Sequence, residues 1–238
     1  MHPTDLPQYA IDGCLRRRGR LHAIEEIDPS KTALVVIDMQ NVFMQEGAPA
    51  EVPVAREIVP NINKLAEATR DTGGRVVWVQ MTHSEQVKED WSVFYSAISR
   101  PERASKMLEW LSRDSEGQSL WPDLDAQDGD LYVEKSRYSA FVQGSSNIDE
   151  VLKDQGIDTV LIVGTLTNVC CESSARDAMM LDYKVLLVSD GNAAPTDEEH
   201  TATLGAIAQV FGDVYSTDEL IDLLQKGGAG ASVQTAAE

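Results

Sequence analysis

The sequence of 238 residues predicts an α/β protein with a doubly wound, mainly parallel six-stranded sheet and helices on both faces. Three observations lead to this fold class. Six short runs rich in β-branched residues alternate with amphipathic stretches, most of the runs are apolar on both faces, and glycines follow the amphipathic stretches. Strands that are apolar on both faces are typical of a parallel sheet covered by helices, and the alternation favours right-handed crossovers.

The strands and helices follow one another along the whole chain. We expect strands at residues 32–38, 75–80, 130–135, 159–164, 184–190 and, with a weaker pattern, 213–217. Amphipathic stretches that predict helices occupy residues 54–72, 145–155, 169–182, 196–210 and 217–225. Gly73, Gly74, Gly156 and Gly212 stand where helices would end, as C-cap glycines do.

The domain organisation follows from these elements. We expect an N-terminal arm at residues 1–30, one α/β domain at 31–226, and a flexible tail at 227–238. The arm carries a basic cluster of four arginines, Arg16, Arg17, Arg18 and Arg20. This cluster is either a contact patch or, as we expect, part of a solvated arm.

An insertion interrupts the domain at residues 83–128, which is too long for an ordinary connection. It is rich in aromatic residues: Trp91, Phe94, Tyr95, Trp110 and Trp121. One interpretation is a helical segment over the carboxyl edge of the sheet, where α/β proteins bind ligands. The other, equally compatible with the sequence, is a packing or dimer element that buries the aromatic side chains.

Composition excludes several classes of function. The formal net charge of −19 would repel nucleic acid, and no apolar stretch approaches the roughly 20 residues of a membrane helix. The chain contains neither GxGxxG after its first strand nor GxxxxGK[ST], so no nucleotide cofactor is expected. Three cysteines without zinc-ligand spacing, and an N-terminus without a signal-like apolar region, favour a reducing cytoplasm and free thiols.

Two adjacent cysteines, Cys170 and Cys171, follow the fourth predicted strand. Helical spacing from Cys171 leads to Ala175 and Ala178, an apolar stripe, whereas spacing from Cys170 leads to Ser174. Cys171 is therefore the packing residue. Cys170 lies in the first helical turn, where a thiolate is favoured and its pKa falls, although a buried free cysteine is often only a small hydrophobic residue.

Two further residues with ionisable side chains stand at the ends of other predicted strands. Asp38 closes the first strand and Lys135 the third. Each alone has an ordinary explanation, since an acid at a strand end often caps a turn and a lysine often extends to solvent. Because the carboxyl ends of parallel strands share one edge, Asp38, Lys135 and Cys170 can nevertheless converge in one cleft.

These residues occur in three motifs, "VVIDMQNVF", "EKSRYSAF" and "VGTLTNVCCESSARDAMMLDYKV". From about residue 32 to 225, the chain resembles the isochorismatase-like cysteine hydrolases, which include nicotinamidases, N-carbamoylsarcosine amidohydrolase and ureidoacrylate amidohydrolase. The resemblance implies a triad of Asp38, Lys135 and Cys170. It also implies a cis peptide bond between Thr165 and Leu166, and an oxyanion hole formed by the backbone N–H groups of Leu166 and Cys170.

The resemblance further implies a cysteine-dependent amidohydrolase that cleaves the C–N bond of a small carboxamide or ureido compound through a thioester and releases ammonia or an amine. A homo-oligomer, either a dimer or a tetramer, is expected. The alternative is a catalytically degenerate member that binds a metabolite or a partner. Isochorismatase chemistry itself is disfavoured, because family members with that activity lack the cysteine.

Four substrate-contact candidates come from the motifs: Gln40, Asn41, Arg137 and Tyr138. Asn41 could instead only cap a turn, and Arg137 could only pair with surface acids. Nicotinamidases bind a metal through an Asp-x-His sequence, but here "QMTHSEQ" leaves His83 without the aspartate. We therefore expect no metal and treat His83 as an ordinary loop histidine.

Overall fold

The computed structural model describes the backbone of residues 1–234 and the side chains of residues 1–228. Its six strands form one sheet in the order β3-β2-β1-β4-β5-β6, and each neighbouring pair is parallel. The strands are β1 (Thr32–Ile37), β2 (Arg75–Met81), β3 (Leu131–Lys135), β4 (Thr159–Thr165), β5 (Lys184–Ala193) and β6 (Asp213–Tyr215). The predicted fold class and all six predicted strands are confirmed.

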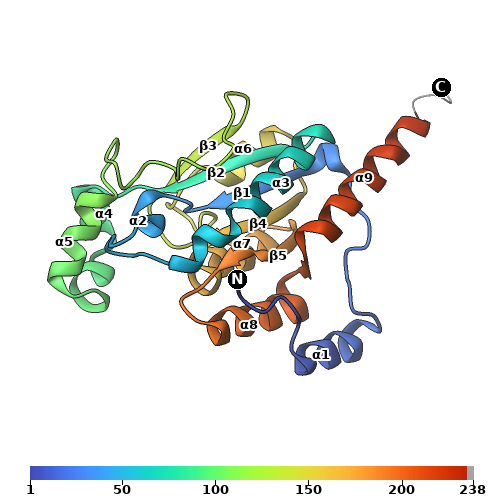
Figure 1. The fold of residues 1–238 in the computed structure, drawn as a ribbon, viewed down its shortest axis with the longest axis horizontal. Coiled ribbons are helices and arrows are strands. Elements are labelled where there is room, and N and C mark those ends of the chain that lie inside the picture. The colour runs from blue at the N-terminus through green and yellow to red at the C-terminus, as the bar shows by residue number, and fades with distance from the viewer. Residues whose placement is uncertain (235–238) are drawn as a thin grey trace.

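Helices cover both faces of this sheet (Figure 1). They are α1 (Gln8–Arg18), α2 (Asn41–Met44), α3 (Val59–Asp71), α4 (Glu85–Asp90), α5 (Pro101–Trp110), α6 (Ile148–Asp154), α7 (Glu172–Met180), α8 (Asp197–Ala206) and α9 (Thr217–Gln234). Shorter 3-10 turns occupy Pro29–Lys31 and Pro53–Ile58, and π-helical turns occupy Phe94–Ile98, Thr167–Cys171 and Ile207–Phe211. No helix in the described chain is long and apolar enough to cross a bilayer.

The two faces of the sheet belong to two separate hydrophobic clusters. In β1, Val35 and Ile37 pack with residues of α6, α7 and α8, whereas Leu34 and Val36 pack with residues of α3 and α9. Every residue of β1 is buried, as a central strand covered on both sides requires. The continuous apolar runs of the sequence therefore reflect two cores separated by one sheet.

Some boundaries differ from the sequence prediction. The helix expected at 54–72 begins as a 3-10 turn and becomes α-helical at Val59, because Pro60 fits only the first turn of an α-helix. At the other end of the chain, α9 continues to Gln234. The helix thus extends over residues 227–234 of the predicted tail, whose flexibility stays a prediction, and residues 235–238 lie outside the described chain.

The N-terminal arm is also more ordered than expected. Helix α1 packs against α8 and the π-turn that follows it, with Ala10 and Cys14 fully buried. Arg18 is held by this contact, since its Nη1 donates to the carbonyl oxygen of Ala208 at 2.9 Å. The expectation of a solvated cluster is thus wrong for Arg18, while the three other arginines of the cluster are exposed.

The insertion contains α4, the π-turn Phe94–Ile98 and α5. Figure 1 shows α4 and α5 at one end of the molecule, on the left, while α9 projects at the opposite end. Leu120 of the insertion forms a bridge with Gln40, which follows β1, and the start of the insertion, just after β2, is tied to its middle by a bridge between His83 and Ser112. It therefore lies beside the carboxyl ends of β1 and β2.

Candidate active site

The site lies between β1 and β4, where the order in which the chain adds strands to the sheet changes from one side to the other. Asp38 follows β1 with a left-handed backbone, φ 53°, a conformation that is uncommon for residues other than glycine and is often found at functional sites. Opposite it, Gly164 pairs with Ile37 and has φ 119°. A Cβ atom there would lie 2.0 Å from the Ile37 carbonyl oxygen, so only glycine allows the two strands to approach at this point.

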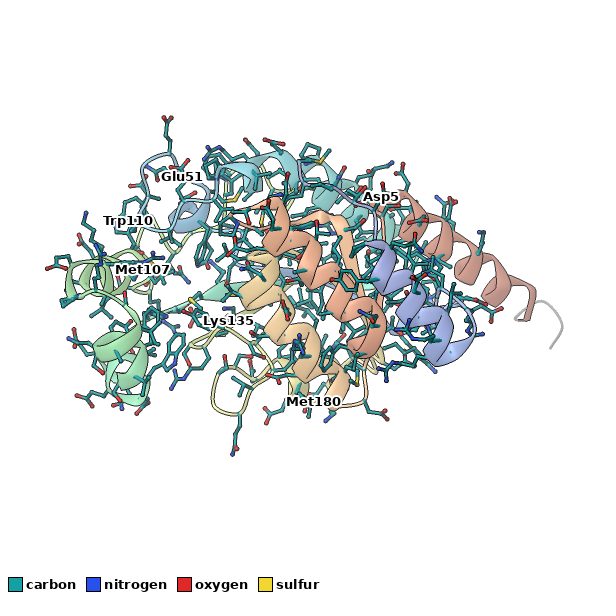
Figure 2. The ribbon with its side chains drawn as sticks, turned by 90° about the horizontal axis from the view of Figure 1, so that it is seen from below. Asp5, Glu51, Met107, Trp110, Lys135 and Met180 are labelled. Atoms are coloured by element: carbon teal, nitrogen blue, oxygen red, sulfur yellow. The ribbon has the colours of Figure 1, made fainter. Side chains whose placement is uncertain are left out.

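Three predicted residues meet at this edge. Lys135 Nζ lies 2.8 Å from Asp38 Oδ2 and 3.6 Å from Cys170 Sγ, and the side chains of all three are buried. Lys135 also donates to the Arg137 carbonyl oxygen at 2.9 Å. Figure 2 shows Lys135 between the helices of the insertion and α7, in the interior of the molecule. The structure therefore brings an acid, an ammonium group and a thiol together.

Burial governs the protonation of these groups. It raises the pKa of Asp38 above 3.8, although the Lys135 charge opposes this effect. Burial alone would lower the pKa of Lys135, but the neighbouring Asp38 and Cys170 outweigh it and raise that pKa. The pKa of the Cys170 thiol is also raised, because burial outweighs the Lys135 charge. The sequence-based expectation of a lowered pKa at a helix start is thus wrong: without substrate the thiol keeps its proton.

The adjacent cysteine has a different environment. Cys171 is fully buried and packs in the same cluster as Ala175 and Ala178, as the helical stripe predicts. Its sulfur only approaches the Val163 carbonyl oxygen, at 3.9 Å. Ser174, on the Cys170 side, is buried as well, and its Oγ accepts a hydrogen bond from the Ala140 N–H at 3.0 Å. Cys171 therefore contributes to packing, while the Cys170 sulfur points to the Lys135 ammonium.

The segment between β4 and the cysteines makes a tight turn. The peptide bond between Thr165 and Leu166 is cis, and Thr165 Oγ1 donates to the Asp38 carbonyl oxygen at 3.2 Å. The Leu166 carbonyl oxygen accepts from the N–H groups of Val169 and Cys171, each at 3.1 Å. This turn starts the π-helical segment and places Cys170 beside the end of β1.

A cavity of about 450 Å³ opens onto Cys170. Its walls come from the Cys170 turn, the loop after α2 and the insertion, and they are largely apolar and aromatic. The wall residues used below are Met81, His83, Trp91, Phe94 and Tyr138. A cavity of this size suits a small organic molecule.

The four substrate-contact candidates differ in whether they line the cavity, and only Tyr138 does so. Tyr138 lines the cavity and meets Trp91 edge-on, with the ring centroids 4.9 Å apart. Arg137 lies behind this wall: its guanidinium is 5.3 Å from the centre of the Trp91 ring, and Nη1 donates to the Ser136 carbonyl oxygen at 2.9 Å. Arg137 thus supports the aromatic wall without lining the cavity.

The other two candidates have structural partners. Gln40 is fully buried; its amide nitrogen donates to the carbonyl oxygens of Met81 and Gln118, and its oxygen accepts from the Met81 N–H at 2.8 Å. Asn41 Nδ2 donates to the Glu116 carbonyl oxygen at 2.8 Å. Both side chains hold the insertion in place, and neither residue lines the cavity. Their role as substrate contacts stays a prediction.

His83 is the residue that the sequence analysis missed. It lies two residues beyond β2, is only 2% exposed and lines the cavity, so it is not an ordinary loop histidine. Burial, aided by the charges of Lys135 and Arg137, lowers its pKa to about 4. In the described chain no three His, Cys, Asp or Glu side chains are placed to hold a metal ion, and aromatic rings surround His83 instead. Its position after a strand was the available signal.

Comparison with known proteins places this geometry in context. The chain matches the family model of the isochorismatase domain over residues 32–219. It is 30% identical to the ureidoacrylate amidohydrolase RutB of Agrobacterium fabrum, over 84% of this chain and 92% of that protein. It is 34% identical to a probable inactive nicotinamidase of Arabidopsis thaliana, over 73% and 86% of the two chains. A crystal structure of a cysteine hydrolase from Pseudomonas syringae pv. phaseolicola 1448A has a TM-score of 0.75 at 30% identity, and the match covers 84% of this chain and 95% of that one.

Proposed function

This chain belongs to the isochorismatase domain family and is a hydrolase of C–N bonds, and we propose that it is a cysteine-dependent amidohydrolase acting on a small carboxamide or ureido compound. The observation that carries the proposal is the buried cluster of Asp38, Lys135 and Cys170 beside the cavity. A cavity that only bound a metabolite would not need a thiol beside a carboxylate and an ammonium group. The names of the relatives support the substrate class.

In the proposed reaction Asp38 takes the proton of the Cys170 thiol, and the sulfur attacks the carbonyl carbon of the substrate. The raised pKa of Asp38 makes its carboxylate a stronger base than an ordinary aspartate, which suits this transfer. The Lys135 ammonium, 3.6 Å from the sulfur, stabilises the thiolate as it forms. The reaction therefore begins from the protonated thiol that burial favours.

The tetrahedral intermediate carries its negative charge on the former carbonyl oxygen. We assign the backbone N–H groups of Leu166 and Cys170 as its hydrogen-bond donors, because both belong to the turn that positions the sulfur. The protonated Asp38 then gives its proton to the leaving nitrogen as the C–N bond breaks, and ammonia or an amine departs. Asp38 next takes a proton from water as the water oxygen attacks the thioester carbonyl carbon. The C–S bond then breaks, and Asp38 returns the proton to the Cys170 sulfur as the acid product departs.

Assembly and location belong to the proposal as well. We place the protein in the cytoplasm, because all three cysteines are free, as is typical of a reducing compartment. We also propose a dimer or tetramer, since the insertion exposes two apolar side chains that flank Phe94 and Tyr95 in sequence, Val93 and Ile98, at 63% and 69% of their surface. Light scattering coupled to size-exclusion chromatography measures the subunit number directly; a monomer would contradict this part of the proposal.

The test is release of ammonia from a panel of small carboxamides and ureido compounds by the wild type and by Cys170→Ala. The proposal expects release that depends on Cys170. The competing interpretation is a degenerate member of the family that only binds its ligand, as the name of the probable inactive relative indicates for that protein. Binding of panel compounds without any ammonia release would support that interpretation.

A further inference from the structure

The ring of His83 lies inside an aromatic enclosure of the insertion. Trp91, Phe94 and Tyr95 surround it, with ring centroids 6.1, 6.2 and 5.8 Å away, and all three contacts are edge-on. Trp91 and Phe94 also line the cavity and stack on each other with centroids 4.5 Å apart. His83 is therefore a polar group set into the apolar wall of the cavity.

The hydrogen bond to Tyr95 determines which ring nitrogen carries the proton. Tyr95 Oη lies 2.7 Å from His83 Nδ1, and this hydroxyl makes no other hydrogen bond in the described chain. A phenol is a stronger acid than a neutral imidazole, and a bare imidazole nitrogen is the better acceptor. The hydroxyl therefore donates to Nδ1, and the proton of the neutral ring resides on Nε2.

That Nε2–H group has no hydrogen-bond partner among the described residues, although it is buried. A buried donor without an acceptor is rare in folded proteins and costs stability unless another role accounts for it. The ring remains neutral at ordinary pH, because burial and the charges of Lys135 and Arg137 lower its pKa to about 4. His83 lines the cavity, and of its two ring nitrogens only Nε2 is left without a partner among the described residues.

Resting on the proposed function, we propose that His83 is a specificity-determining residue whose Nε2–H donates a hydrogen bond to an oxygen atom of the substrate remote from the scissile C–N bond. Tyr95 is the positioning residue that keeps this donor in the required tautomer. The substrate class is thereby narrowed to small amides or ureas that carry such an acceptor oxygen. An apolar analogue of the same shape would leave the donor unpaired and bind less well.

Two pairs of neutral probes test the preference for a remote acceptor oxygen, and the two members of each pair have nearly the same shape. They are 4-oxopentanamide with 4-methylpentanamide, and (2-methoxyethyl)urea with butylurea; in each pair only the first has the remote oxygen. For the pair that the wild type hydrolyses, we expect kcat/KM to favour the oxygen-bearing probe by about tenfold or more, mainly through KM. His83→Leu should abolish the preference and His83→Gln should restore part of it, because the glutamine amide also donates.

A second histidine provides the matched control. His200 is also fully buried, and its Nδ1 likewise meets a hydroxyl, Thr167 Oγ1 at 3.0 Å, but it does not line the cavity. His200→Leu should therefore leave the preference within about twofold of the wild type. Equal loss of kcat/KM for both probes in His83→Leu, or an unchanged preference, would overturn the proposal.

A binding measurement separates this inference from the proposed function. Nitrogen-15 NMR of the four imidazoles should show His83 protonated at Nε2 and not at Nδ1, with the signal assigned by its absence in His83→Gln. The oxygen-bearing probes should shift this Nε2–H signal and their partners should not, also in Cys170→Ala. Such a shift without ammonia release would contradict only the proposed hydrolysis, whereas the Nδ1–H tautomer or the absence of a selective shift would overturn the role of His83.

Discussion

The ammonium nitrogen of Lys135 lies 2.8 Å from a carboxylate oxygen of Asp38, and neither side chain is exposed to solvent. Two opposite charges are thus buried together at the edge of the sheet. Separating such a pair leaves one uncompensated charge in the interior, which is more costly than the absence of both.

Lys135→Met should therefore lower the free energy of unfolding by about 3–5 kcal/mol, since the Asp38 carboxylate is left without a partner. The double variant should lose less unfolding free energy than the sum of the losses of its two single variants, Asp38→Asn and Lys135→Met. Urea unfolding at neutral pH measures all four free energies. Strictly additive losses would contradict the coupling between the two side chains.

Buried histidine makes stability depend on pH. Burial, reinforced by the His2 charge, lowers the pKa of His200 from 6.5 to about 4. As the pH falls through 6.5, the imidazole gains a proton in the unfolded chain but stays neutral in the folded protein. The free energy of unfolding therefore decreases by on the order of 3 kcal/mol between pH 6.5 and about 4. His83, whose pKa is also lowered to about 4, adds a loss over the same window, so His200→Gln should make the decline in urea unfolding series clearly shallower without removing it. An equally steep decline in His200→Gln would contradict the contribution of His200.

Gln40 should matter for stability and not for substrate affinity. Gln40→Leu removes the amide that satisfies the N–H and carbonyl groups of Met81 and the carbonyl of Gln118, so unfolding should become about 3 kcal/mol easier. Unfolding and steady-state kinetics should be measured on the same preparations. A large rise in KM with unchanged stability would instead support the role as a substrate contact.

Gly164 should not tolerate any side chain. Gly164→Ala places a methyl group against the Ile37 carbonyl oxygen and forces φ 119° on alanine, and we expect a loss of about 3 kcal/mol or more. Gly129 offers a matched control, because a Cβ there meets no atom within 4 Å and its φ is not left-handed. Thermal unfolding of the two variants should differ clearly, and similar melting temperatures would contradict the close approach of β1 and β4.

The fold and the meeting of Asp38, Lys135 and Cys170 could be predicted because strand ends follow from local pattern. Asp38 and Lys135 each close an apolar run, and one rule about parallel sheets places such ends on a common edge. The separation of Cys170 from Cys171 likewise needed only helical spacing. The strand ends and the helical spacing can each be recognised within a short segment of sequence. The alternation of strands and helices then predicts the topology that brings these segments together.

The remaining features depend on partners distant in sequence. Gln40 is fixed by backbone groups of Met81 and Gln118, and the Arg18 side chain by the Ala208 carbonyl, and no local pattern indicates either. The pKa of Cys170 also reflects burial from all sides, which reverses the effect expected from the helix start alone. His83 was missed because its chemistry arises from the aromatic side chains that the insertion folds over it.

The most direct test compares ammonia release by the wild type, Cys170→Ala and Cys171→Ala on the same panel of carboxamides and ureido compounds. Because Cys170 Sγ lies 3.6 Å from Lys135 Nζ while Cys171 packs in the core, Cys170→Ala should abolish release and Cys171→Ala should retain it with some loss of stability. Equal residual activity in the two variants would contradict the assignment of Cys170 as the nucleophile.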